Sequence, residues 1–180
     1  AGPAASALAG ARAAGEWPLL LTTADHALLR PALVNDFCAQ AAHLRDADLV
    51  VGLVPAERVR ARFPGSRRTW LKFRDGACCG SNLFYLAKPR AQSALAFWQQ
   101  LEALRKQPWR MAKQLGPSVL ARYLAGRLTL DDALTSIGER CDARLRAVRL
   151  DEPLLAVDVD SPADHRLAGE ILRERHDGPA

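Results

Sequence analysis

Apolar residues in this chain fall into short continuous runs separated by longer periodic stretches. Residues 18–23 and 47–55 are apolar at nearly consecutive positions, which is typical of strands with both faces covered. Residues 31–45 have apolar side chains every three or four positions, which predicts an amphipathic helix. Further helices are predicted at 4–14, 56–63, 90–106, 119–128 and 131–140, and after Pro162.

Four other segments read as strands. Residues 66–74 alternate, with Arg68, Lys72 and Arg74 on the polar side, which predicts a half-exposed strand. Residues 78–88, 143–151 and 154–159 complete the set, and the segment 106–118 is predicted to interrupt the helices. Because strands and helices alternate, the sequence predicts an α/β fold: three layers around a mainly parallel, twisted sheet.

The length of 180 residues suits one domain. We expect that domain to occupy residues 1–176, with a helical insertion at about 104–140 and a disordered tail at 177–180. No run of 18 apolar residues occurs, so no membrane span is expected.

Composition narrows the function only a little. The four cysteines have neither zinc-site spacing nor the pattern of a disulfide framework, so a reducing, cytoplasmic location is expected. The net charge is +5, and 21 of the 25 basic residues are arginine. Nucleotide bias in a GC-rich genome explains most of this arginine content, and the positive excess is only weak evidence for an anionic ligand. No nucleic-acid-binding module is recognisable, so no nucleic-acid partner is expected.

Carboxylates follow two of the predicted strands. Asp25 comes after the run LLLTTA, and Asp158 and Asp160 come after LLAV. Ligands of open α/β sheets bind beyond the carboxyl ends of strands, and paired carboxylates there suit Mg²⁺. The alternative is structural: Asp25 caps a turn, and Asp160 precedes Ser161, the predicted N-cap of the last helix. His26 is predicted to lie on the surface.

A second candidate is the segment DGACCGSN at 75–82, next to the basic strand. Lys72 and Arg74 are inferred from their charge to contact a phosphorylated substrate. The alternative is a solvated strand face beside an ordinary turn, and the residues alone leave both open.

Two stretches resemble the MobA-like NTP transferase family. They are PLLLTTADHALLRPALVNDF (18–37) and AVDVDSPADHRLAGEIL (156–172), the second departing only at His165, where leucine is common. The resemblance implies a Rossmann-like fold of the glycosyltransferase-A type. It also implies nucleotidyl transfer from an NTP to a phosphorylated or other small acceptor, with release of pyrophosphate. It makes Asp25 and Asp160 the catalytic Mg²⁺ ligands and places Gly80 and Asn82 on the acceptor side.

The resemblance also implies a glycine-rich nucleotide loop, roughly LAGGxGxRxG, before this region. The sequence contains no such loop, so the chain resembles a family member truncated at its N-terminus, and we expect it to be inactive alone. Two alternatives stay open: a non-catalytic nucleotide- or ligand-binding domain of the same fold, and a sugar-nucleotide-dependent glycosyltransferase. The sequence identifies neither the NTP, the acceptor nor the oligomeric state.

Overall fold

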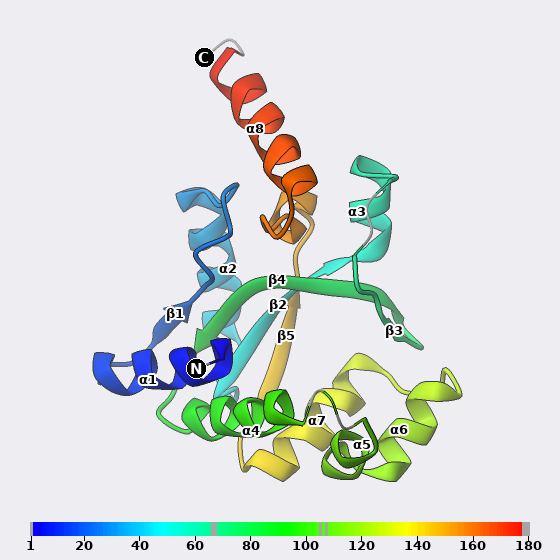
Figure 1. Ribbon diagram of the computed structural model, residues 1–180. Helices are drawn as coiled ribbons and strands as arrows, with labels where there is room; N and C mark the ends of the chain where they lie inside the picture. The colour runs from blue at the N-terminus through cyan, green and yellow to red at the C-terminus, as the bar shows by residue number, and fades with distance from the viewer. Residues whose placement is uncertain (1, 66–67, 105, 107, 178–180) are drawn as a thin grey trace.

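The computed structural model describes residues 2–65, 68–104, 106 and 108–177 (Figure 1). The strands are β1 (Leu19–Leu21), β2 (Leu49–Pro55), β3 (Leu71–Phe73), β4 (Gly76–Leu86) and β5 (Leu145–Arg149). The helices are α1 (Pro3–Ala14), α2 (Pro31–His43), α3 (Ala56–Arg62), α4 (Ala91–Ala103), α5 (Pro108–Leu115), α6 (Pro117–Leu124), α7 (Leu130–Cys141) and α8 (Pro162–Asp177), with a 3₁₀ turn η1 (Pro153–Ala156). None of the helices in these ranges is long and apolar enough to cross a bilayer.

The sheet is mixed, so the prediction of a mainly parallel sheet is wrong. Its order is β1-β4-β2-β5, with β3 paired to the far part of β4. β2 and β5 are parallel, whereas β4 is antiparallel to β1, β2 and β3. β4 follows β3 through a tight turn at Arg74–Asp75, and Gly76, where β4 begins, has φ +125°. That turn reverses the chain, and β4 then runs between strands that share the opposite direction.

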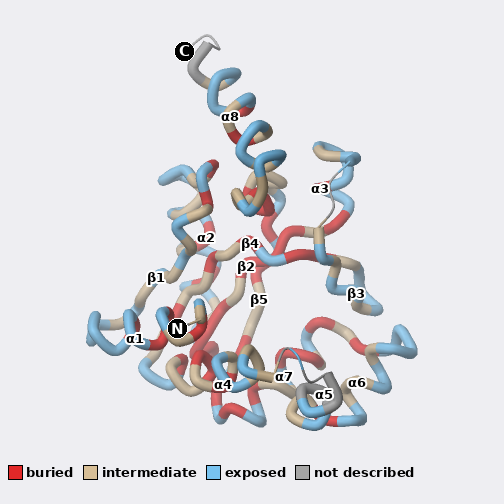
Figure 2. The backbone as a smooth tube through the Cα atoms, in the orientation of Figure 1, coloured by how far each residue is buried: buried red, intermediate tan, exposed pale blue. Residues whose placement is uncertain are grey.

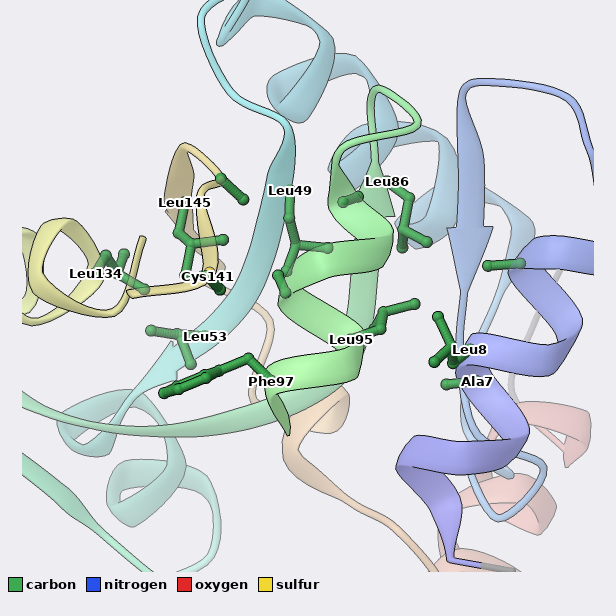
Figure 3. Packing of buried hydrophobic residues seen from close by; sticks show 14 of the residues in the cluster. Ala7, Leu8, Leu49, Leu53, Leu86, Leu95, Phe97, Leu134, Cys141 and Leu145 are labelled. Atoms are coloured by element: carbon green, nitrogen blue, oxygen red, sulfur yellow. The ribbon is translucent and has the colours of Figure 1, made fainter. Parts of the chain in front are cut away.

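Helices cover both faces of the sheet, as the sequence predicted. In Figure 1, α1, α4, α5, α6 and α7 lie below the sheet, and α2, α3 and α8 lie above it. Buried residues concentrate along β2, β4 and the inner faces of these helices (Figure 2). The lower core packs Leu49 and Leu53 of β2 against Leu95 and Phe97 of α4 (Figure 3).

The upper core uses the alternate residues of the same strands. Val50 and Val54 of β2 pack with Phe37 of α2 and Val59 of α3. This alternation follows from the pleat, which sends successive side chains to opposite faces. A third, smaller cluster lies beneath α8 and contains Leu28, Val157, Ala168 and Ile171.

A bulge interrupts the pairing of β2 with β4. Val51 pairs with Phe84 but Leu53 pairs with Gly80, so Gly52 faces three residues of β4. Within the bulge, the Ser81 hydroxyl is buried and donates to the Gly52 carbonyl at 2.9 Å. A Cβ at position 52 would lie 2.4 Å from Ser81 Oγ. The bulge therefore requires glycine at this position.

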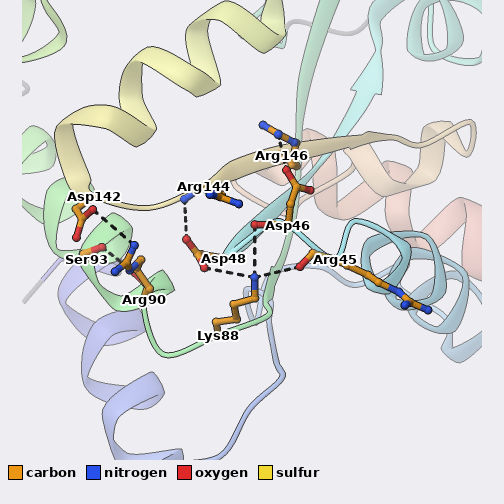
Figure 4. A network of polar contacts seen from close by, with 9 residues as sticks. All are labelled: Arg45, Asp46, Asp48, Lys88, Arg90, Ser93, Asp142, Arg144 and Arg146. Atoms are coloured by element: carbon orange, nitrogen blue, oxygen red, sulfur yellow. Dashed lines mark hydrogen bonds and ion pairs between the residues drawn. The ribbon is translucent and has the colours of Figure 1, made fainter.

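A polar network stabilises the end of the sheet at which β2 and β5 begin and β4 ends (Figure 4). Asp48, which is 5% exposed, accepts a hydrogen bond from the Arg144 N–H at 2.8 Å. Its carbonyl accepts from the Ala87 N–H at 2.9 Å, and Lys88 Nζ lies 3.8 Å from its carboxylate. Through its backbone and its carboxylate, Asp48 thus joins the start of β2, the end of β4 and the start of β5.

Several predicted elements differ in detail. The segment 154–159 is not a strand but η1 followed by extended chain, because Pro153 begins a turn there. In the predicted strand at 66–74, only Leu71–Phe73 pairs with β4, and residues 66 and 67 lie outside the described residues. The segment expected to interrupt the helices contains α5. α8 continues to Asp177, where the tail was expected to begin, and residues 178–180 lie outside the described residues.

Replacing Gly52 by alanine tests the bulge. We expect Gly52→Ala to lower the free energy of unfolding by about 2 kcal/mol, because the new methyl group overpacks a buried site. The measurement is urea unfolding followed by circular dichroism. Gly10→Ala is the control, since a Cβ there meets nothing within 4 Å and alanine favours the interior of α1. Equal stability of Gly52→Ala and the wild type would contradict this account of the bulge.

Candidate functional site

Two segments far apart in the sequence meet at the carboxyl end of β1. The Val159 N–H donates to the Asp25 carbonyl at 3.1 Å, and His26 Nε2 lies 3.2 Å from the Leu155 carbonyl oxygen. Because a carbonyl only accepts, His26 carries its proton on Nε2 in this contact. These contacts place Asp25 beside the segment that contains Asp158 and Asp160.

Three buried polar atoms at this junction have no hydrogen-bond partner among the described residues: Thr23 Oγ1, Asp25 Oδ1 and His26 Nδ1. Leaving a buried acceptor unpaired costs about 1–3 kcal/mol, so such atoms commonly mark a place for water or a ligand. His26 is 6% exposed, so its predicted surface position is wrong. The His26 side chain is buried because its ring packs toward η1 and contacts the Leu155 carbonyl.

A cleft of about 940 Å³ opens beside this junction. Its walls come from the end of α3, the β4 bulge, the segment 157–161 and the first turns of α8. The lining residues are Arg62, Phe63, Pro64, Gly65, Arg68, Thr69, Cys79, Gly80, Asn82, Val157, Asp158, Asp160, Ser161, Ala163, Asp164 and Leu167. The cleft therefore contains both charged and apolar side chains.

Alternation in the segment 157–160 explains how its carboxylates reach the cleft. Val157 and Val159 pack into the cluster beneath α8, and Asp158 and Asp160 line the cleft. Ser161 then begins α8: its hydroxyl accepts from the Asp164 N–H at 3.3 Å, which confirms the predicted N-cap.

The bulge in β4 brings Asn82 into the cleft. In a regular strand Asn82 would share a face with Cys78 and Phe84, which belong to the lower core. Instead Asn82 has φ +54°, a left-handed conformation that asparagine tolerates better than most residues. Its amide Nδ2 donates to Asp158 Oδ2 at 3.4 Å. The distortion thus turns Asn82 toward the upper layer.

The carboxylates in and beside the cleft differ in their partners. Asp158 forms an ion pair and hydrogen bond with the Arg68 guanidinium, and the two side chains are only 22% and 18% exposed. Asp160 is exposed and has no ion pair among the described residues, and Asp25 keeps an unpaired buried oxygen. Asp158 is therefore neutralised locally, whereas Asp25 and Asp160 are available to a cation.

The predicted site residues fall into two groups. Gly80, Asn82 and Asp160 line the cleft, and Asp25 adjoins it through its hydrogen bond with Val159. Lys72 and Arg74 do not line it. Their backbone N–H groups donate to the Tyr123 hydroxyl and the Leu128 carbonyl, which places both residues beside α6 and the loop that follows it.

Arg68 was not predicted at the site. The alternating pattern placed it with Lys72 and Arg74 on a solvated strand face, but the strand begins only at Leu71 and Arg68 turns to Asp158. No spacing in the sequence connects residues 68 and 158. The residues described include no cluster of three or more histidine, cysteine, aspartate or glutamate side chains suited to a metal. A cation here would therefore be bound by two carboxylates and by oxygen atoms of a bound substrate.

Thiol chemistry is disfavoured at the cleft. Burial raises the pKa of the Cys79 thiol, although the charge of Arg68 acts in the opposite direction. Burial raises the pKa of its neighbour Cys78 to about 11. Because only the thiolate is a good nucleophile, burial disfavours a nucleophilic role for both cysteines.

The comparisons with known proteins give one informative match. No family model matches the chain, and no curated protein does. A solved structure from Thermus thermophilus, described as a hypothetical transferase, is 32% identical. The match covers 91% of this chain and 69% of that one, with a TM-score of 0.78. The chain belongs to the family of this hypothetical transferase.

Membership in this transferase family agrees with the general activity expected from the sequence. It also confirms an α/β fold with a central sheet that this family shares. The relationship to MobA-like enzymes and the transfer of nucleotides stay predictions.

Asn82 provides a test of the distorted strand. We expect Asn82→Ala to lower the free energy of unfolding by roughly 1 kcal/mol, because the left-handed conformation is less favourable for alanine than for asparagine. Asn82→Gly loses the same amide without that cost, so it should be the more stable of the two variants. Urea unfolding of both variants makes the comparison. The reverse order of stability would show that position 82 does not need a positive φ.

Proposed function

We propose that these residues form the acceptor and cation side of a nucleotidyltransferase. Support comes from the pairing of Asp25 with the segment that carries Asp160, from the cleft beside them, and from the family's description as a hypothetical transferase. The observation that carries the proposal is the hydrogen bond from the Val159 N–H to the Asp25 carbonyl. It joins the backbone of Asp25 to that of Val159, the residue before Asp160, although the two segments are far apart in the sequence.

The carboxylates fit Mg²⁺. Asp25 Oδ1 is buried without a partner, and Asp160 has no ion pair among the described residues. Mg²⁺ is commonly held by one or two carboxylates together with phosphate oxygens and water. When bound between Asp25 and Asp160, it would neutralise part of the charge of a triphosphate. Asp158 is excluded as a Mg²⁺ ligand because its carboxylate is paired with the Arg68 guanidinium.

The chemistry follows from the charge on the substrates. An acceptor oxygen in the cleft attacks the α-phosphorus of the NTP, and a new P–O bond forms. The bond from the α-phosphorus to the oxygen that bridges to the β-phosphorus breaks, and pyrophosphate leaves with that electron pair. An acceptor that is already a phosphate anion needs no general base, which agrees with a cleft that has no histidine among its lining residues.

Transfer is proposed for these residues together with a glycine-rich loop, because backbone N–H groups in such loops bind phosphates. The 180 residues contain no such loop. For the chain as it stands, the proposal is therefore binding of Mg²⁺ and an NTP without rapid turnover.

Calorimetric titration of the chain with each of the four NTPs, with and without Mg²⁺, tests this function. We expect at least one NTP to bind, and only with Mg²⁺. Asp25→Asn and Asp160→Asn should each weaken binding by more than about 10-fold, because each removes a charged ligand of the cation. Asp151→Asn is the matched control, since Asp151 is exposed and pairs with Arg58 outside the cleft.

Three results would contradict the proposal. They are equal binding by all three variants, binding of every NTP without Mg²⁺, and no binding at all. Mg²⁺-dependent binding of a sugar nucleotide in place of any NTP would favour a glycosyltransferase.

A further inference from the structure

Arg68, Asp158 and Asn82 form one connected unit on the wall of the cleft. Arg68 Nη1 donates to one carboxylate oxygen of Asp158, and Asn82 Nδ2 donates to the other at 3.4 Å. The ion pair is four-fifths buried on both sides. The proposed transfer uses Asp25 and Asp160, places Asn82 on the acceptor side, and gives no role to Arg68 or Asp158.

The chemistry of the unit fixes the orientation of the Asn82 amide. An ionised carboxylate only accepts hydrogen bonds, so the amide group that faces Asp158 must be the NH₂ group. The carbonyl oxygen Oδ1 then points away from Asp158. No described residue donates a hydrogen bond to this oxygen, and Asn82 is one of the residues that line the cleft.

Arg68 is the residue that maintains this arrangement. Asp158 and Asp160 are two positions apart and line the same cleft, so an unpaired Asp158 would compete with Asp160 for a cation. The guanidinium removes that competition and holds the Asp158 side chain in place. The contacts of Arg68 within this unit are with Asp158, so the role we assign to it is that of a positioning residue.

We propose that Arg68 and Asp158 orient Asn82 as a specificity residue that accepts a hydrogen bond from the acceptor substrate. The ligand at this point of the cleft therefore carries an O–H or N–H donor. This inference rests on the proposed function for the identity of the cleft as the acceptor side. The orientation of the amide does not depend on it.

Side-chain NMR of the isotopically labelled chain tests the orientation without any substrate. Asn82→Gly assigns the Asn82 side-chain NH₂ signals by their absence, and glycine accepts the positive φ. In the wild type we expect two well-separated NH₂ proton shifts, with one proton bonded to Asp158. In Arg68→Met, which removes the charge, this separation should fall by at least half. Arg68→Lys, which keeps a cation, should retain most of it.

The variants also have a structural control. All of them should keep the wild-type backbone spectrum in the remote core around Leu95 of α4. If Arg68→Met leaves the Asn82 signals unchanged, Arg68 is not a positioning residue. If the Lys and Met variants change these signals equally, the charge of residue 68 has no part in orienting Asn82. Either result overturns the proposal.

A matched pair of small probes tests the ligand chemistry. Glycerol carries three O–H donors, and 1,2,3-trimethoxypropane has the same carbon skeleton without any. We expect glycerol to shift the Asn82 side-chain carbonyl carbon in the wild type and to have at least a fivefold smaller effect in Arg68→Met, with the ether inactive in both. Equal shifts from both probes, or none from glycerol, would overturn the donor assignment.

The two levels of the proposal fail separately. Loss of Mg²⁺-dependent NTP binding with an intact Asn82 signature rejects the proposed function alone. If NTP binding is retained but the Asn82 signal does not change when Arg68 is replaced, only the role of Arg68 and Asp158 in orienting Asn82 is rejected.

Discussion

The hydrogen bond between the Val159 N–H and the Asp25 carbonyl is the contact on which the candidate site depends. It joins the end of β1 to the chain that leaves β5, two segments that share no strand pairing. The buried His26 ring reinforces it from η1. Without this junction Asp25 would end a short edge strand, and Asp160 would precede a helix with no carboxylate beside it.

The second constraint is the antiparallel strand β4. It separates β1 from β2 and contains the bulge that fits around Gly52. A regular strand would direct Asn82 into the lower core, whereas the bulge directs it to Asp158. Strained backbone at a substrate cleft is common, because the surrounding packing can maintain a geometry that a regular strand does not offer. Here Ser81 and Gly52 provide that packing.

The sequence predicted most elements but not how they connect. Apolar runs located β1 and β2, apolar periodicity located α2, and the N-cap and proline signals located the start of α8, each to within a few residues. The pattern did not predict the direction of β4, since an apolar run is the same whichever way a strand pairs. The strand-end pattern and the resemblance predict Asp25 and Asp160 as site residues, and this stays a prediction. Arg68 was missed because its partner lies 90 residues away and no local pattern links the two. Lys72 and Arg74 were chosen on charge alone, and charge does not say where a strand ends.

The most direct measurement for the central claim is a crystal structure of the chain grown with Mn²⁺ and a non-hydrolysable NTP analogue. Mn²⁺ replaces Mg²⁺ at oxygen sites and gives an anomalous signal. The account predicts one Mn²⁺ peak within roughly 2.5 Å of carboxylate oxygens of both Asp25 and Asp160, with Asp158 still paired to Arg68. A peak bound by Asp158, a peak outside the cleft, or no peak at saturating Mn²⁺ would contradict it.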